Sequence, residues 1–307
     1  MKRVLFEIRY IRKNAGLLFL ALPGIGLFLL FNYIPLYGLI LPFKRYNFVD
    51  GLWGSPWVDP IFENFRFLFA GDAWIITINT LRFNSIFIVV GLVTGIGFAL
   101  MLYELSAKFV KAYQTMLFIP FFLSWVVVAY VGLGLMDMQH GLFNRIITSQ
   151  GGDPVLWYNT PHLWYAILPL ANLWKGVGYG TIIYYTALIN IDPELYEAAS
   201  LDGAGRWRKI WSISLPMIKP LATMLVLLQI GGIIRADFGL FFNFTQNSVM
   251  LYPVTDVIDT YVYRALLRLG DVGMASAAGF YQSVVGFVLV VTANLAVKKL
   301  NPENALF

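Results

Sequence analysis

Long runs of apolar residues constrain the fold of this chain more than any other feature of its sequence. Crossing the hydrocarbon core of a bilayer takes a helix of about 20 mostly apolar residues. Six runs reach this length, at about residues 16–41, 76–102, 116–136, 164–188, 214–236 and 273–297. Hydrophobic residues make up 59% of the chain and charged residues only 13%, whereas soluble domains have about 45–50% and 25%. We therefore predict an all-α, polytopic membrane protein with six transmembrane helices.

The two ends of the chain differ from its apolar middle. Residues 1–15 carry five Lys and Arg among apolar residues, a composition typical of a basic amphipathic helix on anionic lipid. The first apolar run is too long for a cleaved signal peptide and no small-residue cleavage site follows it. We predict one transmembrane domain at 16–297, with a polar loop at 189–216 that could couple it to another protein, and a short cytoplasmic tail at 298–307.

Basic residues are unevenly shared between the two sets of loops. The N-terminus, the 103–115 loop, the 189–213 loop with Lys219, and the tail together hold 13 Lys and Arg, and the opposite loops hold six. Because loops rich in Lys and Arg stay inside the cell, both termini and the 189–216 loop are predicted to be cytoplasmic. The net charge of +5 belongs to this asymmetry, and no basic stripe with stacking aromatics predicts a nucleic-acid partner.

A polar island lies between the fourth and fifth apolar runs, at residues 196–220, with the sequence YEAASLDGAGRWRKIWSISLPMIKP. Asp192 and Pro193 precede it and are residue types that favour the N-cap and first turn of a helix. Small apolar residues follow at helical spacing, and Gly203 and Gly205 permit a sharp turn. A short helix, a turn and a second helix at a membrane surface are suited to docking another protein.

The same island resembles a known signature, the cytoplasmic loop of permease subunits in bacterial binding-protein-dependent ABC importers. The residues that match this signature are Glu197, Ala198, Ala199, Asp202, Gly203, Ala204 and Pro216. An ordinary solvated loop with incidental glycines would not reproduce so long a pattern of fixed spacing and mixed residue types. Further segments, among them FNYIPLYGL, GSPW, WKGVGYG and DVIDTYVYR, are similar to the branch that imports complex oligosaccharides and includes alginate importers.

The resemblance implies an assembly in the bacterial cytoplasmic membrane. A second, homologous permease would complete a heterodimer, two ATP-binding subunits would lie beneath it, and an extracytoplasmic sugar-binding protein or lipoprotein would deliver an oligosaccharide. The chain itself contains no GxxxxGK[ST] or GxGxxG motif, the glycine-rich loops that cradle phosphates. It is therefore predicted to be a transport subunit with no cofactor and no ATPase site of its own, with ATP and Mg²⁺ held by its partners.

The fourth apolar run holds a cluster of polar and small residues. A lysine within a membrane span is costly, so Lys175 is expected to face a partner charge or a wet cavity. In maltose-type permeases the segment that resembles this one lines the sugar cavity, which implies sugar contacts for Trp174, Gly176 and Tyr179. The alternative is tight helix packing through Gly176 and Gly180, with Lys175 extending toward the membrane surface. The residues leave both interpretations open.

The fifth run supplies the other candidate contacts of the substrate path. These are Gln229, Gly232, Arg235 and Asp237. Arg235 and Asp237 could neutralise each other, or either could pair with Lys175 or Arg82. The resemblance is weaker here because Gly232, Arg235 and Asp237 replace asparagines of the maltose-type pattern. Residues of these types could bind either an acidic sugar or the hydroxyls of a large neutral glycan, so the substrate stays open.

Two other function classes fit the sequence less well. An ion-coupled secondary transporter, the alternative to an ATP-driven importer, needs buried acidic residues or broken half-helices for its coupling ion, and the predicted spans offer only Asp237. An intramembrane enzyme would need paired carboxylates, a Ser/Lys dyad or a histidine cluster. The two histidines, His140 and His162, lie in one loop without an HExxH pattern, and there is no cysteine, so no metal site is predicted.

Overall fold

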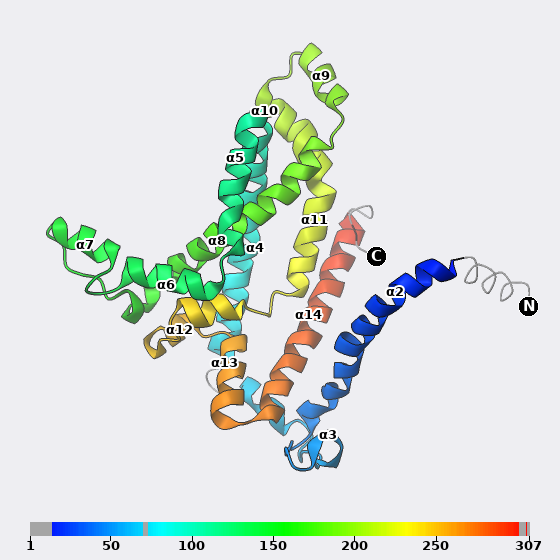
Figure 1. The fold of residues 1–307 in the computed structure, drawn as a ribbon, viewed down its shortest axis with the longest axis vertical. Helices are drawn as coiled ribbons and strands as arrows, with labels where there is room; N and C mark the ends of the chain where they lie inside the picture. Colours follow the sequence, from blue (N-terminus) through cyan, green and yellow to red (C-terminus); the bar gives the residue numbers. More distant parts are fainter. Residues whose placement is uncertain (1–13, 70–72, 301–304, 306–307) are drawn as a thin grey trace, which may run out of the picture.

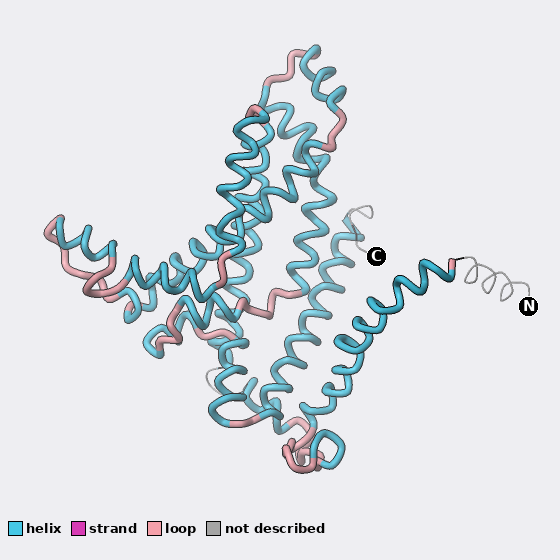
Figure 2. The backbone as a smooth tube through the Cα atoms, viewed as in Figure 1, coloured by secondary structure: helices cyan, strands magenta, loops and turns pink. Residues whose placement is uncertain are grey.

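A computed structural model describes residues 14–69, 73–300 and 305 of the chain. These residues are largely helical and contain no β-strand, apart from an isolated bridge between Lys44 and Trp57 (Figure 2). The predicted all-α membrane fold is therefore confirmed. Most of the predicted amphipathic N-terminus at 1–15, and most of the tail at 298–307, lie outside the described residues.

The helices follow one another along the chain with short connections (Figure 1). Their bounds are α2 Ala15–Phe28, α3 Gly51–Gly54, α4 Ala73–Tyr103, α5 Ala107–Phe118, α6 Trp125–Met136, α7 Leu142–Ser149, α8 Trp164–Ile189, α9 Pro193–Leu201, α10 Arg206–Lys209, α11 Leu215–Gly231, α12 Tyr252–Thr255, α13 Ile258–Arg264 and α14 Val272–Leu300. Turns of π-helix cover Leu29–Tyr33, Ile210–Ser214, Gly239–Phe244 and Ala265–Leu269, and 3₁₀ turns cover Ile34–Phe43, Glu63–Phe69, Ile119–Phe122, Trp157–Asn159, Pro161–Leu163 and Val249–Leu251.

Four helical segments among the described residues are long and apolar enough to cross a membrane unaided. They are Ala15–Phe43, Ala73–Tyr103, Arg206–Gly231 and Val272–Lys299. The helix at the fourth predicted span, α8, has 26 residues, so at about 1.5 Å per residue it exceeds the roughly 30 Å hydrocarbon core. Asn172, Lys175 and several tyrosines make α8 less apolar than those four, so a count of six spans stays a prediction.

The third predicted span, 116–136, is not one continuous helix. The helical segments Lys108–Phe122 and Trp125–Met136 meet at an angle of 98°. Pro120 lies in the last turn before the break, and Ser124 caps the next helix by accepting a hydrogen bond from the Val127 N–H at 3.3 Å. The sequence did not indicate this break, because apolar composition reports burial in lipid and not helix direction.

The fifth predicted span, 214–236, also ends earlier than its composition indicates. The α11 helix stops at Gly231 and residues 232–238 form an irregular loop. An α14 residue, Gly286, lies so close that a Cβ atom on it would be 2.5 Å from the Gly231 carbonyl oxygen. The sequence predicted that Arg235 and Asp237 lie on the outer half of a helix. They lie instead on this loop.

The α4 and α8 helices form the longest contact in the bundle. A Cβ atom on Gly95 would lie 3.3 Å from the Tyr184 ring and one on Gly180 would lie 4.0 Å from the Gly95 Cα. The glycine Gly176, by contrast, has no neighbour within 4 Å of an added Cβ. Of the two glycines proposed for tight packing in α8, only Gly180 meets another helix, and Gly176 faces open space.

The bundle has two distinct ends (Figure 1). At one end, α9 and α10 cap the helix pair α4–α5, and at the other end lie α3 and α13. Separate apolar cores hold the two ends, one around Leu188, Ile191 and Ile218 and another around Phe67, Ile234 and Ile258. The α2 helix has no buried residue and stands apart from the other helices along much of its length (Figure 1).

Candidate functional site

The polar island folds as a short, exposed helix followed by a turn. The Asp192 carboxylate accepts the Glu194 N–H at 3.0 Å, which caps α9 as its sequence predicts. After α9, Gly203 adopts φ +77°, and the Ala204 N–H donates to the Ala199 carbonyl at 2.8 Å. The left-handed conformation favours glycine. The side chain of Glu197 is exposed and has no partner among the described residues, so it is free to contact another protein.

Three contacts tie α9 and the following turn to the membrane helices. The Tyr196 hydroxyl lies 2.9 Å from Oγ of the buried Ser214. Lys209 Nζ donates to Ser200 Oγ at 2.5 Å, and Arg206 Nε lies 3.1 Å from Glu104 Oε2 at the end of α4. Because α10, the π-turn and α11 form one continuous helical segment, displacement of α9 would be passed to α11.

The remaining predicted member of the island, Pro216, lies in the first turn of α11. Proline has no N–H to donate, and it closely follows the π-helical turn Ile210–Ser214, where the regular helical hydrogen-bond pattern is already altered. Pro216 and Lys219 line an open groove of about 530 Å³ between α4 and α11. The predicted coupling residues thus form one surface region around α9, with Pro216 at the start of the helix that leads back into the membrane.

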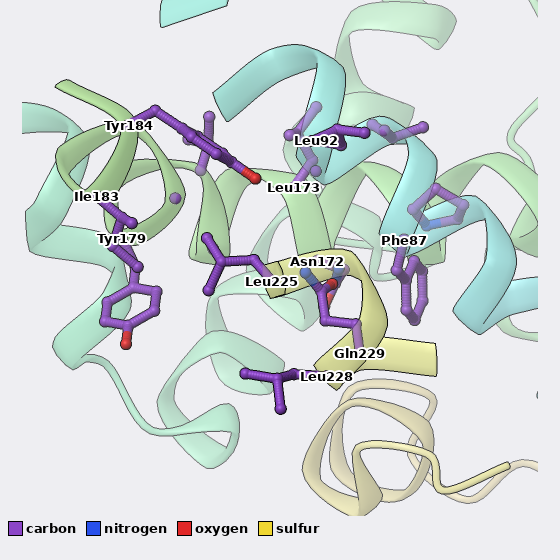
Figure 3. A pocket seen from close by; sticks show the side chains of 16 residues that line it. Phe87, Leu92, Asn172, Leu173, Tyr179, Ile183, Tyr184, Leu225, Leu228 and Gln229 are labelled. Atoms are coloured by element: carbon purple, nitrogen blue, oxygen red, sulfur yellow. The ribbon is translucent and has the colours of Figure 1, made fainter. Parts of the chain in front are cut away.

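A cavity of about 460 Å³ lies between α4, α8 and α11, midway along the bundle. Three of the predicted substrate-path residues line it, Gly176, Tyr179 and Gln229. Asn172 and Tyr184 add further polar groups, and the rest of the wall is mostly apolar. Figure 3 shows Asn172 and Gln229 at one part of the wall and the Tyr179 ring at another.

The polar groups of this cavity are free to bind a ligand. The side-chain amides of Asn172 and Gln229 make no hydrogen bond within the described part of the chain, while neighbouring α8 hydroxyls such as Thr181 bond their own helix. Aromatic rings and unpaired amides are the groups that bind a sugar, since its C–H face stacks and its hydroxyls form hydrogen bonds. Among the residues that the structure describes, no charged side chain lines the cavity.

The other predicted substrate-path residues on α8 lie outside this cavity. Lys175 reaches the break between α5 and α6, where its Nζ donates to the Phe121 carbonyl at 3.0 Å. Trp174 is 45% exposed and is not among the residues that line the cavity. The cavity therefore brings together Gly176, Tyr179 and Gln229, whereas Trp174 and Lys175 do not line it.

The charged residues of the 232–238 loop have partners that the sequence did not predict. Arg235 Nη2 donates to Ser283 Oγ at 3.0 Å, and Trp125 Nε1 donates to Asp237 Oδ2 at 2.6 Å. Arg82 in turn donates to the Tyr165 hydroxyl at 2.9 Å. The expected ion pairs of Arg235 or Asp237, with each other, Lys175 or Arg82, are therefore absent from the described residues.

Side chains from three helices satisfy the backbone of this loop. The Asn84 amide donates to the carbonyls of Ile233 and Arg235 at 2.7 and 2.9 Å, and Gln282 donates to Ile234 at 3.0 Å. The Ala236 N–H donates to Asp259 at 2.7 Å. Burial raises the pKa of the Asp259 carboxyl, and the hydrogen bond from Ala236 offsets part of that rise. Irregular backbone at membrane depth requires such partners, and Gly232 sits at the start of the segment that they hold.

Sequence reasoning missed several residues that build the site. Asn84 and Gln282 were not singled out, although each is a polar residue inside an apolar run, which was the available signal. Asn172 was not chosen as a substrate contact either, although it is a polar residue within the fourth apolar run. The Trp125–Asp237 contact joins residues 112 positions apart, and no pattern in the sequence indicates it.

Comparisons with known proteins agree with this geometry. The family described as "Binding-protein-dependent transport system inner membrane component" matches residues 91–302. Protein LplB of Bacillus subtilis (strain 168) is 32% identical, over 95% of this chain and 92% of its own length. The polygalacturonan/rhamnogalacturonan transport system permease protein YteP of the same organism is 36% identical, over 92% of this chain and 87% of its own.

Solved structures show the same fold. A chain of a bacterial ABC transporter involved in the import of the acidic polysaccharide alginate superimposes with a TM-score of 0.85. It is 32% identical in sequence, and the match covers 95% of this chain and 98% of that one. A chain from the bacterial alginate ABC transporter in complex with an alginate pentasaccharide-bound periplasmic protein gives a TM-score of 0.83 at 32% identity, over 95% of this chain and 97% of that one.

Proposed function

This chain belongs to the family of binding-protein-dependent transport system inner membrane components, and we propose that it is a transmembrane permease subunit of an ATP-driven oligosaccharide importer. One observation carries the proposal. The loop signature that resembles importer permeases forms an exposed helix, α9, which is tethered through Tyr196 and Ser214 to the helix leading to the cavity. A push on α9 from outside the chain would therefore reach the cavity wall.

The proposed partners follow from the family and from what the chain lacks. An extracytoplasmic sugar-binding protein would deliver the oligosaccharide, as expected of a binding-protein-dependent system. The chain has no phosphate-cradling loop, so two ATP-binding subunits would supply hydrolysis and hold ATP and Mg²⁺, one of them receiving α9. A second, homologous permease would complete the pathway, and the bare surface of α2 would contact either that subunit or lipid.

The coupling residues and the orientation belong to this proposal. Glu197, Ala198, Ala199, Asp202, Gly203 and Ala204 would form the surface presented to the ATP-binding subunit, and Pro216 would begin the helix that carries the motion onward. This surface would face the cytoplasm, together with both termini, in agreement with the excess of basic residues in those segments. The protein would lie in a bacterial cytoplasmic membrane and switch access by rigid-body motion.

The substrate path would run past the cavity between α4, α8 and α11. Tyr179 would stack against a sugar ring, Gly176 would leave room for it, and the free amides of Asn172 and Gln229 would bond its hydroxyls. The exposed candidates Trp174, Gly232, Arg235 and Asp237 would contact sugar only where a second permease encloses them. Relatives named for polygalacturonan and alginate transport favour a polymer-derived glycan.

Three alanine variants test this placement of the path. Gln229→Ala and Asn172→Ala should each raise the KM for uptake about 2- to 12-fold, which corresponds to one neutral hydrogen bond of about 0.5–1.5 kcal/mol. Tyr179→Ala should impair uptake more strongly, while assembly and basal ATPase activity stay normal. The matched control is Gln114→Ala, which removes an amide from α5 outside the cavity. Normal uptake by all three cavity variants at wild-type protein levels would refute the proposed path.

A further inference from the structure

The lysine inside α8 has an unusual set of partners. Lys175 Nζ donates to the Phe121 carbonyl at 3.0 Å and lies 5.4 Å from the ring centroids of both Phe121 and Trp125. No carboxylate forms an ion pair with it within the described ranges. The ammonium group is therefore stabilised by a backbone carbonyl and two aromatic faces, all at the break between α5 and α6.

A break of 98° leaves backbone groups that need partners. The last carbonyls of a helix have no helical donor and carry the negative end of the helix dipole, and in an apolar surrounding an unpaired carbonyl is costly. The Leu123 N–H returns to the Pro120 carbonyl at 3.2 Å. The next carbonyl, that of Phe121, receives the Lys175 ammonium, so a cation caps the helix end.

The same region of α8 is shaped to fit this break. The Tyr179 and Phe121 rings are stacked, with centroids 5.0 Å apart and planes inclined by 10°. A Cβ atom on Gly178 would lie 2.0 Å from the Leu117 carbonyl oxygen, so only glycine permits the two backbones to approach this closely. Lys175, Gly178 and Tyr179 thus hold the end of α5 through charge, close contact and ring stacking.

The far side of the break is held by the 232–238 loop and by Gly239, the first residue of the π-turn that follows it. Trp125 Nε1 donates to Asp237 Oδ2 at 2.6 Å, and the other oxygen of Asp237 accepts the Gly239 N–H at 2.9 Å. A Cβ atom on Gly239 would lie 2.4 Å from the Trp125 ring. The Trp125 indole therefore joins the Lys175 cation on one side to the Asp237 carboxylate on the other.

We propose that Lys175 is a positioning residue that locks the bend between α5 and α6, so that this bend, the middle of α8 and the 232–238 loop move as one rigid body. The proposal rests on the importer function and adds a role that is distinct from sugar contact. Locking would ensure that motion arriving through α11 and its following loop also reorients α6 and the cavity wall formed by α8.

The bend can be measured without any sugar. The chain has no cysteine, so spin labels can be placed at Tyr113→Cys on α5 and Tyr130→Cys on α6, where both side chains are exposed. The distance distribution between the labels is recorded by pulsed electron paramagnetic resonance in the reconstituted complex. Lys175→Met should lower the ratio of the bent form to a form in which α5 and α6 are no longer held at this angle. The expected change is about tenfold or more, which is the effect of losing a hydrogen bond to a charged group. The distance distribution should broaden accordingly.

Two variants and a control separate locking from a general loss of charge. Lys175→Arg retains a cation and should keep the narrow distribution. Trp125→Phe keeps a ring but loses the Asp237 hydrogen bond, and should broaden the distribution even if Lys175→Met fails to assemble. Lys108→Met, which removes an unpaired exposed lysine from α5, should have no effect. A wild-type distribution in Trp125→Phe, and in Lys175→Met where it assembles, would overturn the proposal.

Transport distinguishes positioning from sugar binding. If Lys175 locks the bend, the complex with Lys175→Met should import less sugar per ATP hydrolysed, and its KM for the sugar-loaded binding protein should stay unchanged. Trp125→Phe should show the same effect and replaces Lys175→Met if that variant does not assemble. A raised KM with normal sugar imported per ATP would show that Lys175 contacts sugar and would overturn the positioning role. Because the spin-label measurement needs no transport, it remains decisive even if the importer function is wrong.

Discussion

The close approach of α8 to the end of α5 can be tested by adding one methyl group. In Gly178→Ala, the new Cβ would lie 2.0 Å from the Leu117 oxygen, 2.4 Å from the Leu117 carbonyl carbon and 2.8 Å from the Phe118 Cα. All three are backbone atoms and cannot rotate away. The two helices would have to separate by about 1 Å or more before ordinary contact distances are reached.

Such overpacking costs about 1–3 kcal/mol. The matched control is Gly176→Ala, two residues earlier on α8, where nothing lies within 4 Å of an added Cβ. Alanine is favoured over glycine in a helix interior by about 0.5–1 kcal/mol, so this control should keep or raise stability. We expect Gly178→Ala to melt below wild type, and Gly176→Ala at or above it, when the purified complex is heated and the soluble fraction is followed. Equal melting of the two variants would refute the packing argument.

Further predictions concern coupling, topology and the loop between α6 and α8. Glu197→Ala and Gly203→Pro should both abolish sugar-stimulated ATPase activity while the binding protein still binds sugar, and proline at position 203 cannot adopt the observed φ of +77°. Retained stimulation in both variants would exclude α9 as the docking helix. A membrane-impermeant thiol reagent added to intact cells should label Ser149→Cys and spare Ser200→Cys, and the reverse pattern would invert the topology. Asn144→Ala removes five hydrogen bonds of a buried side chain and should lower the free energy of unfolding by about 1–3 kcal/mol. Calorimetry would detect this as a lower unfolding temperature, and an unchanged unfolding transition would contradict the structural role of Asn144.

The fold class and α9 could be predicted because they depend on local sequence. Apolar runs of sufficient length require helices that satisfy their own backbone in lipid, and the Asp192–Pro193 cap and the turn at Gly203 are encoded by neighbouring residues. The 98° break and the early end of α11 at Gly231 could not be predicted in the same way. Both depend on distant partners, such as Lys175 for the Phe121 carbonyl and Gln282 for the loop carbonyl of Ile234.

The substrate path shows a similar division. The resemblance selected Gly176 and Tyr179, and the polar residues of the fifth apolar run supplied Gln229; the cavity brings the three together. Lys175 was a candidate on a different ground, because a charge inside a membrane span needs a partner or a wet cavity. The lysine instead meets a helix end that the sequence presents as part of a continuous span. Composition shows that a charge needs a partner, but three-dimensional structure is required to identify that partner.

The central claim is that this chain carries an oligosaccharide through the membrane at the expense of ATP hydrolysed by its partners. The most direct measurement is uptake of labelled oligosaccharide into proteoliposomes that contain the chain with its second permease and ATP-binding subunits. The sugar-loaded binding protein is added outside and ATP inside. We predict uptake that requires both ATP and the binding protein and persists when ion gradients are collapsed. Uptake that proceeds without ATP and is driven by a proton or sodium gradient would contradict the claim and favour a secondary transporter.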